Sequence, residues 1–268
     1  MKVTMEGRRA YPGTQAVLRA VSLLKAFTPA EAERGLAELC REVGLHKTTA
    51  FRLLSALESE GLIERGTDGG RYRLGPELVV LGARARGGND LRSASQEEMQ
   101  ALAQLTRETV TLEVLTGGQA LILDEAMGSY MVGANPSVGT RWPAHATSTG
   151  KVLLAHLPAA ERARLLAGPL AAPTPKTITN PRLLERELLR VRERGYAVSA
   201  EELELGFVAV GVPLRGADGE VVAALSVGGP RARFTPERTS EIGRQLPAAA
   251  ARISGRLGFR GLTNRWLL

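Results

Sequence analysis

The sequence predicts an α+β protein of two domains, the first small and mainly helical and the second larger and mixed. Its 268 residues reach the size at which a single core usually stops growing. Residues 35–57 contain two short amphipathic runs with helical spacing, whereas residues 109–134 alternate between apolar and polar side chains as strands do. The Gly-Gly-Asn-Asp sequence at residues 87–90 breaks the chain between them. We therefore expect domains at residues 1–88 and 89–268.

The two amphipathic runs predict a helix-turn-helix. Apolar residues recur at i, i+3, i+4 and i+7 on both sides of a turn at Gly44, first at Leu36, Leu39, Cys40 and Val43 and then at Ala50, Leu53, Leu54 and Leu57. The opposite face of the second helix carries Lys47, Thr48, Phe51, Arg52 and Ser55, and no acidic residue occurs between residues 44 and 57. A helix-turn-helix places such a helix in the DNA major groove. An ordinary helical hairpin is the alternative at this point.

The residues that follow favour a winged domain. Strands are expected at Leu62–Arg65 and Arg71–Leu74, joined by a glycine-rich turn. A first helix is expected at Thr14–Phe27, with its inward side chains at Val17, Ala20, Val21 and Leu24. Arginines of the wing and of the N-terminal arm suit phosphate or minor-groove contacts. The predicted DNA-binding residues are Arg9, Lys47, Thr48, Thr49, Phe51, Arg52, Arg71 and Arg73.

Residues 76–268 predict a connector helix and then a mixed domain with a mostly antiparallel sheet. The connector is expected at Pro76–Arg86. Helices of the domain are expected at Leu91–Glu108, Ser148–His156, Pro181–Arg194 and Pro236–Leu257, the last with a candidate kink at Pro247. Strands are expected within 109–134, with hairpin turns at Gly117-Gly118 and Gly128-Ser129, and then at Gly195–Ser199, Phe207–Leu214 and Glu220–Val227.

Composition narrows the class of protein. No apolar stretch is long enough to cross a membrane, and the N-terminus lacks the apolar core of a signal peptide, so a cytoplasmic location is expected. The net charge of +7 agrees with nucleic-acid binding but is weak evidence alone. Neither a nucleophile elbow, a complete phosphate-binding loop nor a metal-ligand spacing of His and Cys occurs. We therefore expect no catalytic residues, no metal and no cofactor.

Three sequence motifs, which follow one another along the chain, together resemble one known protein family. They are VLRAVSLLKAF through RYRLG, GTRWPAHATSTGKVLLAHLP, and RERGYAVSAEELELGFVAVGVPLRGADGEVVAALSVGGP. Together they resemble the IclR family of bacterial transcription regulators over most of the chain. The resemblance implies a C-terminal GAF-like effector-binding domain after the winged helix. It also implies a homodimer or homotetramer that binds a double-stranded DNA operator as repressor or activator. A small-molecule sensor or enzyme with a non-DNA partner is the alternative.

The resemblance also implies where an effector would bind. Matching positions of the family's pocket are Ser148, Thr149, Ser199, Ala209, Ser226 and Gly228. Relatives that bind small keto acids often have Asp, Cys and Ser where this chain has Ser199, Ala209 and Gly228. We therefore expect a small organic acid that is larger than those keto acids and is aromatic or branched. Val198 and Leu225 are expected to contribute to the apolar wall of the pocket. Trp142 either stacks on a ring of the effector or packs as an ordinary core or interface residue. His145 either lines the effector pocket or makes a structural hydrogen bond.

Overall fold

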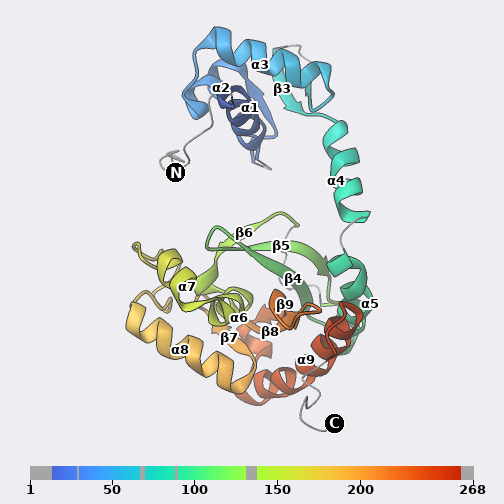
Figure 1. Ribbon diagram of the computed structural model, residues 1–268, viewed down its shortest axis with the longest axis vertical. Coiled ribbons are helices and arrows are strands. Elements are labelled where there is room, and N and C mark those ends of the chain that lie inside the picture. The colour runs from blue at the N-terminus through green and yellow to red at the C-terminus, as the bar shows by residue number, and fades with distance from the viewer. Residues whose placement is uncertain (1–13, 29, 67–69, 88–89, 131–137, 261–268) are drawn as a thin grey trace. The chain divides into compact units, whose positions relative to one another are not determined.

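Two units make up the chain, Met1–Gly88 and Asn89–Leu268. The computed structural model describes residues 14–28, 30–66, 70–87, 90–130 and 138–260 (Figure 1). Arg9, one of the predicted DNA contacts, lies outside the described residues, as do residues 131–134 of the predicted strand region. The α+β class is confirmed, with a small sheet in the first unit and a larger one in the second.

The first unit is a winged helix-turn-helix, as predicted. Its helices are α1 (Gln15–Lys25), α2 (Leu36–Val43), α3 (Lys47–Ser59) and α4 (Glu77–Gly87). Its antiparallel sheet has the order β1-β3-β2, formed by β1 (Glu33–Gly35), β2 (Ile63–Arg65) and β3 (Arg71–Leu74). Gly44 ends α2 with a φ of 69°, a left-handed conformation that costs glycine little and turns the chain into α3. Strand β1 was not predicted, because its three residues, ERG, carry no apolar alternation.

The core of this unit corrects one detail of the predicted first helix. Val17 and Val21 are 64% and 39% exposed, and α1 instead buries Leu23 and, just after its end, Phe27. Both sets have helical spacing, so periodicity alone does not distinguish them. Packing decides, because Leu23 contacts the cluster formed by α2, α3 and the wing.

The second unit is built on one antiparallel sheet with the order β6-β5-β4-β9-β8-β7 (Figure 1). The strands are β4 (Thr109–Thr116), β5 (Gln119–Ala126), β6 (Arg141–Pro143), β7 (Ala197–Ala200), β8 (Phe207–Arg215) and β9 (Val221–Pro230). The helices are α5 (Asp90–Thr106), α6 (Ser148–His156), α7 (Ala159–Leu165), α8 (Pro181–Arg194) and α9 (Pro236–Arg256). Among the described helices, none is long and apolar enough to span a bilayer.

Helices cover both faces of this sheet. Helices α5 and α9 pack on one face around Leu112, Val210 and Leu246, whereas α6 and α8 pack on the other around Val152 and Leu188. The β4–β5 hairpin turns at Gly117 and Gly118, as predicted, and both glycines have positive φ. Helix α9 continues through Pro247. The two-sided covering buries the middle of the sheet.

Candidate functional site

A cavity of about 600 Å³ lies in the second unit. It is lined from the first turn of α6, from all six strands of the sheet and from the segment that joins β7 to β8. All six predicted effector-binding residues line it: Ser148, Thr149, Ser199, Ala209, Ser226 and Gly228. Trp142 lines it as well. The structure therefore brings together six predicted positions that are up to 80 residues apart in the sequence.

Strand alternation explains why these residues share one face. In the registers of the sheet Thr109 pairs with Gly228, Gly228 with Ala209, and Ala209 with Ser199. Directly paired residues point to the same side of a sheet, so this row crosses four strands on the cavity side. Gly211 of β8 lies on the same side, and a Cβ there would come within 3.0 Å of the backbone of Ser148 and Thr149. A glycine at this point lets the N-terminus of α6 approach the sheet.

The apolar wall differs from the one expected. Val198 and Leu225 belong to the core between the sheet and α9, on the face away from the cavity. Each is directly next in sequence to a cavity residue, and neighbours along a strand point to opposite faces. The apolar side chains that do line the cavity are Ile122, Trp142, Leu203, Leu205, Phe207 and Pro230.

Two further predicted residues form structural hydrogen bonds. Ser199 lines the cavity, but its hydroxyl donates to the carbonyl of Ala146 at 2.8 Å, which ties β7 to the segment before α6. His145 is buried with Nε2 2.8 Å from the carbonyl of Ala171, and it is not among the lining residues. Within the described ranges, no group of three or more His, Cys, Asp or Glu is arranged to hold a metal ion.

Glu113 is a cavity residue that the sequence analysis missed. It lies on β4, and its carboxyl accepts hydrogen bonds from Thr149 at 2.6 Å and from Thr111 at 2.7 Å. Burial raises the pKa of the Glu113 carboxyl, and these two hydrogen bonds partly oppose that effect. One signal was available: Glu113 follows Thr109 and Thr111 at a spacing of two, which puts an acid on an inward face of a strand.

Lys151 is a second buried ionisable group near the cavity. Its side chain is 1% exposed, and Nζ donates to the carbonyl of Val198 at 2.6 Å and to Glu202 at 2.7 Å. The lysine thereby holds α6 to the segment of residues 201–206, of which 203–206 line the cavity. Glu201 secures the same segment, because it pairs with Lys176 and accepts from the backbone N–H of Gly206. The hydrogen bond from Lys176 is the main reason why the pKa of Glu201 is lowered.

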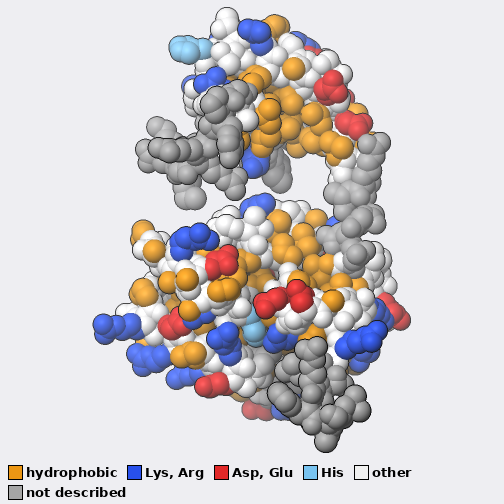
Figure 2. All heavy atoms as spheres, viewed as in Figure 1, with side chains coloured by type: hydrophobic (Ala, Val, Ile, Leu, Met, Phe, Trp, Pro, Cys, Tyr) orange, Lys and Arg blue, Asp and Glu red, His pale blue; other side chains and the backbone are white. Residues whose placement is uncertain are grey.

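The predicted DNA-binding residues of α3 lie on the exterior of the first unit. Lys47, Thr48, Phe51 and Arg52 are exposed, and Phe51 is 46% exposed although it is aromatic. Thr49 is half-buried. The same helix buries Ala50, Leu54 and Leu57 against the core, so its apolar and polar faces are separated as predicted. Figure 2 shows Lys and Arg side chains on the surface of this unit around the position of α3.

The wing arginines are paired with glutamates. Arg71 lies 3.2 Å from Glu38 and donates to the carbonyl of Glu33, and Arg73 lies 2.7 Å from Glu64. Hydrogen bonding from the backbone N–H of Gly35 is the main cause of a lowered pKa at Glu38, and Arg71 adds to it. Exposed ion pairs of this kind are worth about 0–1 kcal/mol, so a phosphate could displace the glutamate at little cost.

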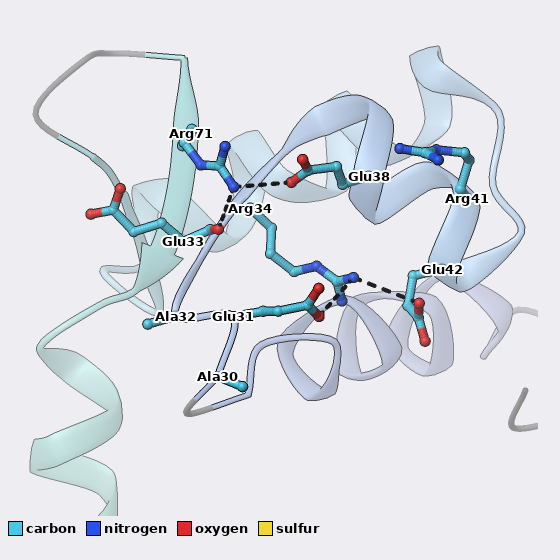
Figure 3. Close-up of a pocket in the computed structure, with 9 residues that line it drawn as sticks. All are labelled: Ala30, Glu31, Ala32, Glu33, Arg34, Glu38, Arg41, Glu42 and Arg71. Carbon is cyan, nitrogen blue, oxygen red and sulfur yellow. Dashed lines mark hydrogen bonds and ion pairs between the residues drawn. The ribbon is translucent and has the colours of Figure 1, made fainter. Parts of the chain in front are cut away.

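Figure 3 shows the surroundings of Arg71, a polar cavity of about 640 Å³ in the first unit. Arg34 lies between Glu31 and Glu42 at 3.1 and 3.7 Å, and Arg71 points toward Glu38. Most of the charged side chains that line this cavity are paired with one another, and the cavity has little apolar surface to hold a ligand. We therefore place the candidate ligand site in the second unit.

Comparison with known proteins identifies the family of both domains. The family profile described as bacterial transcriptional regulator IclR C-terminal matches residues 84–255, and the one described as IclR helix-turn-helix domain matches residues 16–66. This chain belongs to the IclR family of transcription regulators. The HTH-type transcriptional regulator XynR of Escherichia coli K12 is 33% identical over 249 residues, which cover 92% of this chain and 99% of XynR.

Solved structures give the same family. An IclR transcriptional regulator from Alicyclobacillus acidocaldarius is 31% identical, with a TM-score of 0.83 over 91% of this chain and 98% of that one. An IclR homologue from Microbacterium hydrocarbonoxydans, crystallised with 4-hydroxybenzoate, is 31% identical, with a TM-score of 0.79 over 90% and 98%. The protein is therefore a DNA-binding transcription regulator with a GAF-like effector-binding C-terminal domain, and not an enzyme.

Proposed function

We propose that this regulator binds its operator as a symmetric homo-oligomer and changes its DNA affinity when a small organic acid, aromatic or branched, enters the cavity of the second unit. The observation that carries the proposal is the cavity itself. Its volume of about 600 Å³ falls in the usual range for small-molecule sites, and hydroxyl groups alternate with apolar walls around it. DNA affinity changes only by the ligand's differential affinity for the two states of the protein, typically about 1–3 kcal/mol.

The cavity's composition favours an acid larger than a two- or three-carbon keto acid. Ser199, Ala209 and Gly228 are smaller or less acidic than the residues often found there in keto-acid-binding relatives. Trp142 and Phe207 line the same space and offer aromatic surface to a ring. The first turn of α6 also lines it at Ser148, and a helix N-terminus favours a carboxylate. The relative crystallised with 4-hydroxybenzoate supports an aromatic acid.

Calorimetry with two classes of acid tests the effector. We expect aromatic or branched acids to bind with a negative heat-capacity change, because they bury the apolar wall, and glyoxylate and pyruvate to bind weakly. The Ala209→Trp variant should abolish binding by filling the cavity, whereas Ala217→Trp, on an exposed turn, should not. Tight binding of glyoxylate or pyruvate without any response to larger acids would contradict the proposed ligand class.

Oligomerisation is expected from exposed apolar side chains on the first unit. Val79 of α4 is 74% exposed and Val17 of α1 is 64% exposed, and Figure 2 shows hydrophobic side chains gathered on this unit. A single recognition helix contacts too few base pairs to specify one operator in a genome, and a dimer on a palindromic operator contacts twice as many. We expect light scattering at micromolar concentration to give a dimer or tetramer, and Val79→Asp to halve that mass.

Val222→Asp is the matched control for this prediction, because Val222 is 43% exposed but lies in the second unit, on β9. It should leave the mass unchanged. A wild-type protein that stays monomeric with and without operator DNA would contradict the proposed assembly.

Sequence-independent DNA binding is expected from the wing. Replacing Arg71 and Arg73 with alanine should weaken specific and non-specific DNA binding to a similar extent. Arginines that bind phosphates do not contact the base edges and so do not distinguish one sequence from another. The salt slope of binding should fall by about 1 for each phosphate that the variant no longer neutralises. Fluorescence anisotropy at several salt concentrations measures both. The control variant, Arg164→Ala with Arg186→Ala, removes the same charge from the second unit. Weaker binding confined to one operator sequence would show base readout instead.

A further inference from the structure

The cavity of the second unit has an acidic rather than a basic lining. Two carboxyl side chains, Glu113 and Glu204, line it, and among the described lining residues there is no Lys, Arg or His. Lys151 is close by but is held by the Val198 carbonyl and by Glu202. A ligand anion placed against Glu113 would therefore meet a buried carboxyl with no cation on the cavity wall to offset the repulsion.

The hydroxyl groups around Glu113 form a chain of hydrogen bonds. Thr149 donates to Oε2 and Thr111 donates to Oε1 of Glu113. Ser226 Oγ lies 2.8 Å from Thr111 Oγ1, and Thr147 Oγ1 lies 3.3 Å from Thr149 Oγ1. Thr147 Oγ1 also accepts from the backbone N–H of Gly150 at 2.9 Å. The chain thus joins the two sides of the cavity, α6 and β9, through the carboxyl on β4.

The direction of these bonds follows from the number of protons. A hydroxyl group has one proton to donate, and an ionised carboxylate has none. Because Thr111 donates to Glu113, Ser226 must donate to Thr111, and because Thr149 donates to Glu113, Thr147 must donate to Thr149. The four hydroxyl protons are then all used within the chain, and none is left for a ligand. With Glu113 ionised, its carboxylate and these four hydroxyls offer a ligand lone pairs only.

We propose that Glu113 determines effector specificity by requiring a hydrogen-bond donor, a hydroxyl or an ammonium group, on the part of the effector that lies against it. This inference rests on the proposed function, because it concerns the same cavity. A second carboxylate at that position would face a buried acid and four acceptors. A bare C–H edge would leave the buried carboxylate's remaining lone pairs without a partner. Both are penalised relative to a donor.

The test compares four probes that differ in one group. They are 4-hydroxybenzoate, benzoate, terephthalate and methyl 4-hydroxybenzoate, measured by calorimetry against the wild-type protein. A hydrogen bond to a charged group is worth enough to change affinity by roughly tenfold or more. We expect 4-hydroxybenzoate to bind at least about tenfold more tightly than benzoate, and terephthalate to bind no better than benzoate. Equal binding of 4-hydroxybenzoate and benzoate, or a preference for terephthalate, would overturn the role of Glu113.

The Glu113→Gln variant keeps the size and shape of the side chain but removes the carboxylate, because the amide that replaces it can donate as well as accept hydrogen bonds. We expect it to reduce the preference for the hydroxyl probe to within about threefold. Glu161→Gln is the matched control, since Glu161 is an exposed glutamate of α7 outside the cavity, and it should keep the wild-type preference. An unchanged preference in Glu113→Gln would contradict the inference, and circular dichroism checks that both variants fold.

The same panel distinguishes this inference from the proposed function. Binding of methyl 4-hydroxybenzoate without binding of any acid would overturn the acid effector while supporting the donor requirement. Binding of benzoate as tightly as 4-hydroxybenzoate would support the acid effector and overturn the donor requirement. If none of the four probes binds at millimolar concentration while operator binding is intact, an aromatic effector and the donor requirement are both overturned.

Discussion

Replacing Lys151 with methionine is expected to lower the free energy of unfolding by about 3–5 kcal/mol, because it leaves a buried carboxylate without its partner. Lys151 is 1% exposed and Glu202 is 9% exposed, and their charged atoms lie 2.7 Å apart. The lysine also donates to the Val198 carbonyl, which would lose that donor. Urea unfolding followed by circular dichroism measures the change.

The double variant Lys151→Met with Glu202→Gln should recover part of this stability, because the uncompensated charge is gone. Glu97→Gln is the control for an exposed ion pair, since Glu97 is 78% exposed beside Arg256, and it should change stability by less than about 1 kcal/mol. A Lys151→Met protein as stable as the wild type would show that water or another group compensates Glu202.

The destabilisation in Lys151→Met should depend on pH. Burial is the main reason why the pKa of Glu202 is raised above its ordinary value of 4.5, and Lys151 opposes that rise. Without Lys151 the pKa of Glu202 should rise further. The folded state then binds a proton more readily than the unfolded state, so stability falls as pH rises through this window. The defect should therefore be largest near neutral pH and should shrink as the pH is lowered toward 4.5.

Replacing Arg52 with alanine is expected to cost about 1–3 kcal/mol of operator binding for each half-site, and to relax specificity at one base pair there. Arg52 lies on the exposed face of α3, one residue after the exposed Phe51. A guanidinium in the major groove can bind the O6 and N7 acceptors of guanine with two hydrogen bonds, and alanine leaves both without a donor. A dimer binds in this way twice, so the two free-energy costs should add.

Fluorescence anisotropy with DNA from the intergenic region beside the gene measures this cost, and base substitutions across the site locate the relaxed position. Arg164→Ala is the matched control, because it removes an exposed arginine from the second unit and changes the net charge equally. If Arg52→Ala and Arg164→Ala have the same operator affinity, α3 does not read DNA through this side chain.

The order of the elements could be predicted from local spacing. Helix α6 begins and ends at Ser148 and His156, and α8 at Pro181 and Arg194, as the sequence predicted. The period of 3.6 or 2 residues is a property of the backbone, so a stretch of apolar positions predicts its own helix or strand without knowledge of its partners. The family motifs add the pocket positions, and their cavity location follows from the strand registers.

Which groups face each other was decided only by the tertiary structure. Glu113 meets Thr149 across 36 positions, Lys151 meets Glu202 across 51, and Arg71 meets Glu38 across 33. None of these pairs can be recognised from sequence periodicity. Each partner lies on a helix, strand or loop whose local sequence pattern is the same whether or not the other partner is present. The sequence alone determined the two domains, the family resemblance and the element types apart from the short elements β1, β6 and α7. Packing between distant segments determined that the cavity is acidic, that a lysine is buried beside it, and that the wing arginines are paired. The physical reason is that burial and hydrogen bonding depend on the sum of all neighbours in space, whereas sequence patterns report only the neighbours along the chain.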